Sequence, residues 1–422
     1  SVKEKITRTL YAHLLPQYLC AILVITLIVT FFGYTRFSAY HGFVILPFML
    51  LLLFPVSQGV IALMNWFLPL LLTPVPLPKM DYSEGVPGDR STIVVIPTVL
   101  SGLADVTKLV HSLEIRYLGN RDDNLFFALL TDLRNAPTEE LPEDEELVNL
   151  LAAEIEGLNE RYQSDKPGTF FLMHRSRTWN AGEGAWMGYE RKRGILEAFS
   201  LYLSDHRNNR FSRIVGRQDL LADIKYVITL DTDTQLPRNS ARSLIGAITH
   251  PLSRPMSDPK TGVIKEGYGI LQPRVALSLS ESGISRFASL FGGEQGIDPY
   301  TRAVSDLYQD AFHEGSFIGK GIYDLGEFSR SIKGRFPENL ILSHDLLEGC
   351  YARSGLVSDV QVFEEHPISY LADIRRRHRW IRGDWQIIPW LFPRVTDNSS
   401  KKQRNPLSLL SRWKIFDNLR RR

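Results

Sequence analysis

The chain has 422 residues, enough for one large domain or two average ones, and 44% of them are hydrophobic, which excludes an intrinsically disordered protein. The formal net charge is +2, so the chain as a whole has no electrostatic attraction for nucleic acid, and we expect no nucleic-acid partner. Two cysteines, Cys20 and Cys350, favour a reducing compartment over a disulfide-stabilised exported protein.

Two long apolar stretches lie within residues 1–72. The first, from Tyr18 to Phe37, has no charge before Arg36 and is long enough to cross a hydrocarbon core of roughly 30 Å as a helix. The second, from Gly42 to Leu72, is also uncharged. Each stretch therefore predicts one transmembrane helix, and a helical hairpin buried in a soluble protein is the alternative.

The basic residues Lys3, Lys5 and Arg8 precede the first apolar stretch. By the positive-inside rule they place the N-terminus in the cytosol. After two crossings, everything past Leu72 is expected in the cytosol as well, so the chain should be a multi-pass membrane protein with a cytosolic domain.

Residues 73–90 are rich in proline and glycine and predict a linker, after which residues 91–390 form the main domain. Within this domain two apolar runs, NLFFALLTD and KYVITLD, each end in aspartate. Such runs are typical of buried parallel strands, so we expect an α/β domain with a mostly parallel central sheet. Ligands bind beyond the carboxyl ends of such strands, where Asp132, Asp231 and Asp233 would lie.

An acidic segment between these two runs has the apolar spacing of a helix. Its expected buried stripe consists of Leu147, Leu150, Leu151, Ile155 and Leu158. The acidic residues on the other face are interpreted as solvated surface.

Residues 391–422 mix tryptophan, aliphatic residues and arginine, which is typical of amphipathic helices at a membrane interface. The segment ends in the basic cluster Arg420, Arg421 and Arg422. Basic clusters of this kind occur on the cytosolic side of a span, so we expect a further membrane helix to follow in the intact polypeptide.

The segment LDTDTQLPR places Asp231 and Asp233 directly after an apolar strand. Two carboxylates one residue apart in a turn can hold a divalent ion, which neutralises a diphosphate leaving group. A phosphatase of haloacid-dehalogenase type is the alternative. Its motif is not fully matched, because Gln235 stands where threonine or valine is expected.

In the segment LSHDLLEG, Asp345 follows an apolar stretch and is surrounded by small and polar residues. Transfer of a sugar with inversion needs one carboxylate that takes the proton of the acceptor hydroxyl, and Asp345 is the candidate for this base. Capping of a helix N-terminus by Ser343 or Asp345 is the structural alternative.

The segment RRRHRWIRGDW contains Arg376, Arg379 and Trp380. A guanidinium can bind a pyrophosphate, and an indole face can bind a sugar ring. Arginine and tryptophan in an interface helix can equally serve as lipid anchors.

The order of these features resembles that of the processive inverting glycosyltransferases of cellulose-synthase type. The chain departs from their Gln-x-x-Arg-Trp pattern, because Arg376 stands in the glutamine position. Seven segments between about Ile93 and Trp390 resemble, more narrowly, the cyclic β-1,2-glucan synthases of glycosyltransferase family 84: WNAGEGAWMGYERKRG, DTDTQLPR, GYGILQPRV, GGEQGIDPY, EGSFIGKGIYD, LSHDLLEG and RRRHRWIRGDWQ.

The resemblance implies a GT-A fold, UDP-glucose as donor, a growing β-1,2-glucan as acceptor, and Mg²⁺ or Mn²⁺ as cofactor. It also implies residue roles, which are all expectations: Asp132 for uridine, Asp231 and Asp233 for metal and diphosphate, Lys192 and Arg193 near the nucleotide, Arg376, Arg379 and Trp380 for the sugar nucleotide, Gln272 and Trp380 for the acceptor, and Asp345 as base. It further implies a location in the bacterial inner membrane, within its lipid bilayer, and fusion to further membrane helices and a glycoside-phosphorylase-like domain.

Two alternatives stay open, namely a processive synthase of another linkage and a non-catalytic membrane sensor that binds sugar nucleotide or glucan. The family resemblance also suggests that the glucan starts on the protein itself. Tyr162 is our candidate for this first acceptor, because it ends the acidic helix and is followed by polar sequence with Pro167 and Gly168.

Overall fold

The computed structural model describes residues 13–41, 45–74, 76–163, 168–278, 285–287, 306–365, 367 and 369–421. Several residues used above lie outside these ranges: Lys3, Lys5, Arg8, Pro167, the segment GGEQGIDPY, and Arg422.

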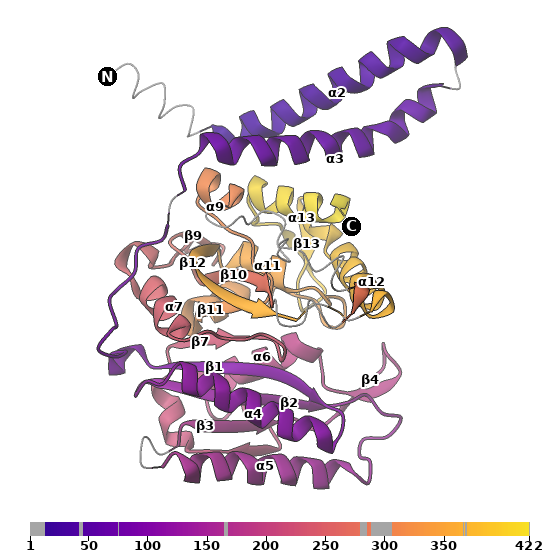
Figure 1. The fold of residues 1–422 in the computed structure, drawn as a ribbon. Coiled ribbons are helices and arrows are strands. Elements are labelled where there is room, and N and C mark those ends of the chain that lie inside the picture. Colours follow the sequence, from indigo (N-terminus) through magenta and orange to yellow (C-terminus); the bar gives the residue numbers. More distant parts are fainter. Residues whose placement is uncertain are drawn as a thin grey trace.

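Two long apolar helices form a hairpin at one end of the molecule (Figure 1). Helix α2 comprises Leu14–His41 and helix α3 comprises Ile45–Leu71. Their segments Leu14–Arg36 and Pro47–Leu71, with mean hydropathies of 2.2 and 2.0, are long and apolar enough to cross a membrane. The two predicted apolar helices are therefore confirmed.

An eight-stranded sheet forms the centre of the remaining chain, with strand order β12-β10-β11-β7-β1-β2-β3-β6. The pairs β7–β1, β1–β2, β2–β3 and β10–β12 are parallel, and the other three pairs are antiparallel. The strands are β1 (Thr92–Leu100), β2 (Leu125–Leu133), β3 (Phe170–His174), β6 (Arg213–Val215), β7 (Tyr226–Thr229), β10 (Ile270–Leu277), β11 (Gly321–Asp324) and β12 (Ser354–Glu364). The expected α/β domain with a mostly parallel central sheet is confirmed.

Helices cover both faces of this sheet, which explains why its central strands are apolar without alternation. In β1, Val94 and Ile96 face one core, while Ile93 and Val95 face the other. The first core includes α4 (Leu103–Gly119), α5 (Asp144–Arg161) and α7 (Ser240–Thr249), and the second includes α6 (Arg191–Ser204) and α10 (Leu325–Ile332).

Helix α5 buries the predicted stripe with one exception. Leu147, Leu151, Ile155 and Leu158 are buried, whereas Leu150 is 38% exposed. At about 100° of rotation per residue, Leu150 lies about 95° from the centre of the other four. The expectation for Leu150 was therefore wrong.

The remaining elements lie around the sheet and below the hairpin. They are η2 (Gly88–Arg90), β4 (Thr178–Asn180), β5 (Ala185–Met187), η3 (Gln218–Asp223), η4 (Pro251–Ser253), β8 (Met256–Ser257), β9 (Ile264–Glu266), α9 (Leu307–Phe312), α11 (Asp345–Tyr351), α12 (Tyr370–Gln386), η5 (Ile388–Leu391), β13 (Arg394–Thr396), β14 (Lys402–Arg404) and α13 (Leu409–Arg421).

Helices α9 and α13 lie between the sheet and the apolar hairpin (Figure 1). Tyr18 and Ile61 of the hairpin pack against Leu307 of α9. The Nε2 atom of Gln58 in α3 donates to the carbonyl oxygen of Arg420 in α13, at 2.7 Å. These contacts fix the hairpin on the domain.

Candidate functional site

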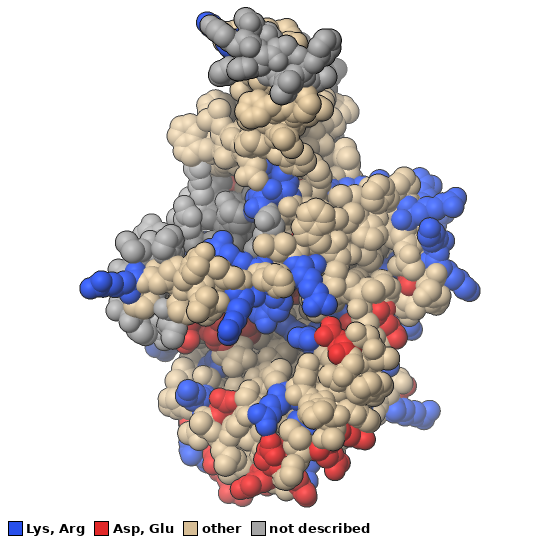
Figure 2. All heavy atoms as spheres, turned by 90° about the vertical axis from the view of Figure 1, so that its right-hand side faces the viewer, with Lys and Arg blue, Asp and Glu red and all other residues tan. Residues whose placement is uncertain are grey.

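A cavity of about 970 Å³ opens at the carboxyl ends of the central strands, with α12 on its opposite wall. Figure 2 shows the molecule hollowed at this level, with Lys and Arg gathered around the hollow. Most of the predicted site residues line this cavity: Asp132, Lys192, Arg193, Asp231, Asp233, Asp345, Arg376, Arg379 and Trp380.

The two aspartates of the DTD segment lie in a turn directly after β7. The buried guanidinium of Arg116 fixes this turn from below, because it donates to the carbonyl oxygens of Thr232 at 2.8 Å and Thr234 at 2.7 Å. Burial lowers the pKa of Arg116 to about 10, which leaves it charged at neutral pH. Asp233 itself is exposed to the cavity.

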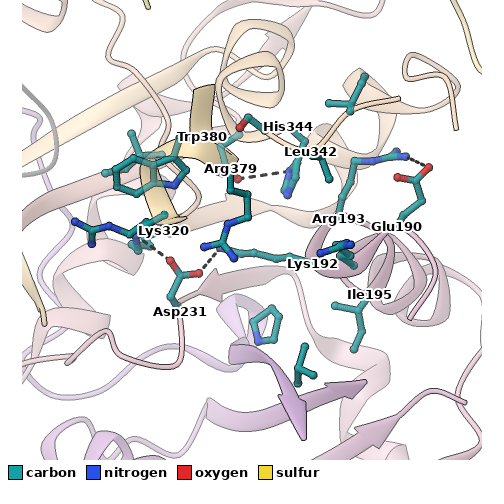
Figure 3. Close-up of a pocket in the computed structure, with 18 of the residues that line it drawn as sticks. Glu190, Lys192, Arg193, Ile195, Asp231, Lys320, Leu342, His344, Arg379 and Trp380 are labelled. Atoms are coloured by element: carbon teal, nitrogen blue, oxygen red, sulfur yellow. Dashed lines mark hydrogen bonds and ion pairs between the residues drawn. The ribbon is translucent and has the colours of Figure 1, made fainter. Parts of the chain in front are cut away.

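Two lysines converge on Asp231 (Figure 3). The Nζ atom of Lys192, in the first turn of α6, lies 2.5 Å from Oδ1, and the Nζ atom of Lys320 lies 2.9 Å from Oδ2. Burial would raise the pKa of the Asp231 carboxyl, but the two ammonium groups outweigh it and hold this pKa well below its usual range. Burial would lower the pKa of both lysines, but the neighbouring carboxylates outweigh it and raise the pKa of each.

Lys320 also forms an ion pair with Glu364, at the end of β12. The Glu364 side chain is buried, and burial raises the pKa of its carboxyl despite the attraction of Lys320. Lys320 therefore links the residues at the ends of β7 and β12 through charge, although β11 and β10 lie between these two strands in the sheet.

Asp231, Asp233 and Glu364 each offer a carboxylate oxygen within 4.8 Å of the others. Mg²⁺ and Mn²⁺ prefer such oxygen ligands, so the donor set fits either ion. The ammonium groups of Lys192 and Lys320 neutralise part of the negative charge of this cluster.

Asp132 lies at the end of β2, where the guanidinium of Arg175 holds its carboxylate in two hydrogen bonds of 2.9 and 2.7 Å. Both side chains are only 6% exposed. A side chain at Gly188 would overlap the Asp132 carboxylate, so only glycine fits there. Burial raises the pKa of Asp132, although Arg175 opposes it.

Asp345 is the first residue of α11, and its carboxylate is partly exposed to the cavity. Neither Ser343 nor Asp345 caps the helix: the cap position is held by His344, which makes no side-chain capping bond. A Cβ atom at Gly319 would lie 2.7 Å from the Asp345 carboxylate, so this glycine leaves the space that the carboxylate fills.

The buried His344 lies beside this carboxylate. Its Nδ1 atom is 3.5 Å from Asp345 and 3.0 Å from Glu348. Burial would lower the pKa of the imidazole, but the two carboxylates raise it above the usual value. His344 is therefore positioned to hold a positive charge next to Asp345.

On α12, the guanidinium of Arg376 lies 4.7 Å from the centre of the Trp380 ring and forms an ion pair with Asp373 at 3.1 Å. Both Arg376 and Trp380 line the cavity, together with the exposed Arg379. Arg193 is held differently, because its guanidinium forms an ion pair with Glu190 at 2.7 Å (Figure 3).

Two predicted residues lie outside the cavity wall. Gln272 is buried in β10, where its side-chain oxygen accepts from the backbone N–H of Ile318 at 2.6 Å. It thereby supports the segment that leads to Lys320. Tyr162 ends α5, donates to Glu114 at 2.8 Å and packs edge-on against Tyr117, so it is held on the domain.

Sequence reasoning missed four charged residues of this region: Arg116, Arg175, Lys320 and Glu364. Glu364 ends the strand SGLVSDVQVFE, whose polar residues Ser358, Asp359 and Gln361 break the apolar run that precedes Asp132 and Asp231. Lys320 lies between two glycines in a segment that we quoted only for its resemblance.

The fold and the cavity define a class: an α/β domain with a charged cavity at the carboxyl ends of its parallel strands, attached to two helices that are apolar enough to cross a membrane. Over 374 residues, which is 88% of this chain, the sequence is 42% identical to the cyclic beta-(1,2)-glucan synthase NdvB of Rhizobium meliloti (strain 1021). This similarity confirms the resemblance to cyclic β-1,2-glucan synthases. The match spans 13% of that protein's length.

No family model matches the chain. A crystal structure of GalNAc-T7 with UDP, GalNAc and Mn²⁺ overlaps 66% of this chain and 44% of that one, at 12% sequence identity and a TM-score of 0.30. A match at this level assigns neither a ligand nor a metal.

Proposed function

We propose that this chain is the catalytic part of a membrane glycosyltransferase of GT-A type, which transfers glucose from UDP-glucose to a growing β-1,2-glucan with inversion. One observation carries the proposal: a single cavity brings Asp231, Asp233 and Asp345 together with the basic residues of α6 and α12. The relation to the glucan synthase NdvB supports glycosyl transfer as the type of reaction.

The basic residues suit the donor. Lys192, Lys320 and Arg379 all line the cavity and can bind a diphosphate. Asp231, Asp233 and Glu364 would hold the divalent ion, which supplies charge neutralisation of the leaving group when it is bound. Asp132, whose carboxylate is held by Arg175, would form the wall beside the uridine.

Asp345 is the proposed base. Its partly exposed carboxylate faces the cavity and would take the proton of the acceptor hydroxyl as the new glycosidic bond forms. Trp380, which carries Arg376 on one face, would bind the acceptor sugar. Gln272 would act indirectly, through the backbone that it holds.

For the cell, we propose a location in the bacterial inner membrane with the domain in the cytosol, where UDP-glucose is made. We also propose that the chain is divided into a membrane region (residues 1–72), a linker (73–90), the catalytic domain (91–390) and an interface segment (391–422). In the intact polypeptide we propose further membrane helices and a phosphorylase-like domain. Tyr162 as first acceptor stays a prediction, and its contacts with Glu114 and Tyr117 give it no support.

Membranes that contain the full-length protein, incubated with radiolabelled UDP-glucose, test the proposal by release of UDP and by linkage analysis of the glucan. Labelled β-1,2-linked glucan is the expected product. Recovery of only 1,3- or 1,4-linkages would leave a processive synthase of another linkage. Binding of UDP-glucose without UDP release would leave a sensor.

A further inference from the structure

The histidine directly before the proposed base lies in the wall of the cavity and is almost fully buried (Figure 3). The Nδ1 atom of His344 faces two carboxylates, that of Glu348 at 3.0 Å and that of Asp345 at 3.5 Å. A ring nitrogen that faces two acceptors carries its hydrogen, because both carboxylates would repel a lone pair in that place. His344 therefore presents an N–H group, and in its protonated form a cation, to the base.

The two carboxylate oxygens of Asp345 have different surroundings. Its Oδ1 atom is buried and has no hydrogen-bond partner among the residues that the structure describes, and it is the oxygen that lies 3.5 Å from His344. The side chain as a whole is 30% exposed, so Oδ2 is the oxygen that is open to the cavity. A cation beside Oδ1 fixes the direction of the carboxylate and leaves Oδ2 free for a substrate.

Glu348 supplies the counter-charge of His344, since its carboxylate is buried and lies nearer to the imidazole than that of Asp345 does. The pair of His344 and Glu348 is neutral by itself. Asp345 can therefore take up a proton without leaving a buried cation uncompensated. Asp231 differs, because the ammonium groups of two lysines hold it as an anion. The surroundings thus suit one aspartate to proton transfer and the other to charge.

The segment that carries His344 is held by the last turns of α12. The backbone N–H of Leu342 donates to the side-chain oxygen of Gln386 at 2.8 Å. A Cβ atom at Gly383 would lie 2.8 Å from the backbone nitrogen of Ser343, so the close approach of helix and segment requires glycine there. The backbone before the base is thus fixed, which leaves the direction of the carboxylate to its side-chain neighbours.

From these contacts we propose that His344 is a positioning residue for the base, which, with Glu348 as its counter-ion, turns Oδ2 of Asp345 toward the hydroxyl group of the acceptor sugar. This inference rests on the proposed function. As the acceptor oxygen bonds to C1 of the glucose, the bond from C1 to the diphosphate breaks and UDP leaves with its electron pair. The hydroxyl proton moves to Oδ2 of Asp345, while His344 keeps its own proton beside Glu348.

The charge of His344 gives the transfer a pH dependence. Burial lowers the pKa of the imidazole, but Glu348 and Asp345 outweigh burial and the ammonium group of Lys192 in α6, and they raise this pKa above its usual value. The charge is present below the raised pKa and is lost as the pH rises through it. The turnover number should therefore fall on the alkaline side, and Glu348→Gln should move this fall to lower pH.

The test measures kcat and KM for UDP-glucose as a function of pH, by UDP release from the full-length protein. We expect His344→Leu to lower kcat roughly ten- to hundredfold, as for a base misplaced by about 1 Å, with KM close to that of the parent. His344→Asn keeps an N–H donor near the position of Nδ1, so it should recover most of this loss. Neither variant should show the alkaline fall that His344 causes.

His174→Asn is the matched control. His174 is as buried as His344, but it lies outside the cavity wall with its Nδ1 atom 2.9 Å from the hydroxyl of Thr131. This variant should keep the alkaline fall of the parent at the same pH. The free energy of unfolding is measured for every variant, so that a loss of folded protein is not counted as a loss of turnover.

A His344→Asn variant that is no faster than His344→Leu would limit His344 to a role in folding and overturn this inference. An alkaline fall at the same pH in the parent and in Glu348→Gln would also overturn it, because His344 would then not be the group that titrates. A parent protein that releases no UDP from UDP-glucose would overturn the proposed function instead.

Discussion

Replacement of Lys320 by methionine should destabilise the domain strongly, because it removes the partner of a buried carboxylate. Methionine keeps the length and the apolar stem of lysine but carries no charge. Asp231 would retain Lys192, whereas among the residues that the structure describes Glu364 would keep only the hydroxyl of Thr234, at 3.3 Å. Removal of one partner of a buried ion pair costs about 3–5 kcal/mol, since the other charge stays buried without compensation.

A matched control exists at the surface. Lys79 forms an ion pair of 2.7 Å with Asp359, and the two side chains are 21% and 56% exposed. Exposed pairs contribute about 0–1 kcal/mol, so Lys79→Met should change little. The double variant Lys320→Met/Glu364→Gln removes the uncompensated charge and should recover most of the loss.

The measurement is the free energy of unfolding in urea at pH 7, for the full-length protein in detergent. The m-value, which is the dependence of this free energy on urea concentration, should be the same in all variants. The pKa of Lys320 is raised in the folded chain, so its contribution is present below its unfolded pKa and is lost as the pH rises through the folded value. The pKa of Asp231 is lowered, so its contribution is present above its unfolded pKa and is lost on acidification. Both are fully present at pH 7. A Lys320→Met variant that loses no more stability than Lys79→Met would refute the reasoning.

Three further predictions concern turnover, acid stability and topology. Asp345→Asn should retain UDP-glucose affinity but lose elongation, and a variant with weak donor binding and normal turnover would show that Asp345 has another role. Burial lowers the pKa of His174 from 6.5 to about 4, so on acidification the unfolded chain takes up the proton before the folded chain does. The free energy of unfolding should therefore fall by about 3 kcal/mol as the pH is lowered from 6.5 to 4. His174→Gln should remove this pH dependence in the urea titrations. A reporter fused after Leu72 should be active in the cytosol, and activity only in the periplasm would reverse the proposed topology.

The sequence predicts the strands well because burial on both faces leaves an unbroken apolar run, as in β1 and β2. It also places Asp132 and Asp231 correctly at strand ends, since the carboxyl ends of parallel strands meet at one edge. The charge partners could not be read locally. Arg175 is 43 residues from Asp132, and only the strand order brings the two together.

The role of Gln272 could not be predicted for the same reason, because its contact also depends on strand order. Alternation along β10 does not tell which neighbour its amide meets, and the antiparallel partner β11 brings the segment of Ile318 to it. Leu150 shows the reverse case, because its angle on the helix is fixed by the sequence alone and already separates it from the buried stripe.

The charges of the candidate site lead to a last prediction, namely that a divalent ion and a nucleoside diphosphate bind with positive coupling. Asp231, Asp233 and Glu364 carry three negative charges and Lys192 and Lys320 carry two positive ones, which leaves one negative charge. A divalent ion alone turns this into one positive charge, which attracts the diphosphate, whereas without the ion the diphosphate meets one net negative charge.

Each ligand should therefore raise the affinity for the other by the same factor, roughly 5- to 150-fold. Titration of UDP with and without Mn²⁺, and of Mn²⁺ with and without UDP, measures both sides of this equality. Asp233→Asn should reduce the coupling, because it removes one exposed carboxylate while Asp231 and Glu364 keep their lysine partners. UDP affinity that is independent of Mn²⁺ in the parent protein would show that the lysines alone neutralise the diphosphate, and that the carboxylate cluster holds no metal.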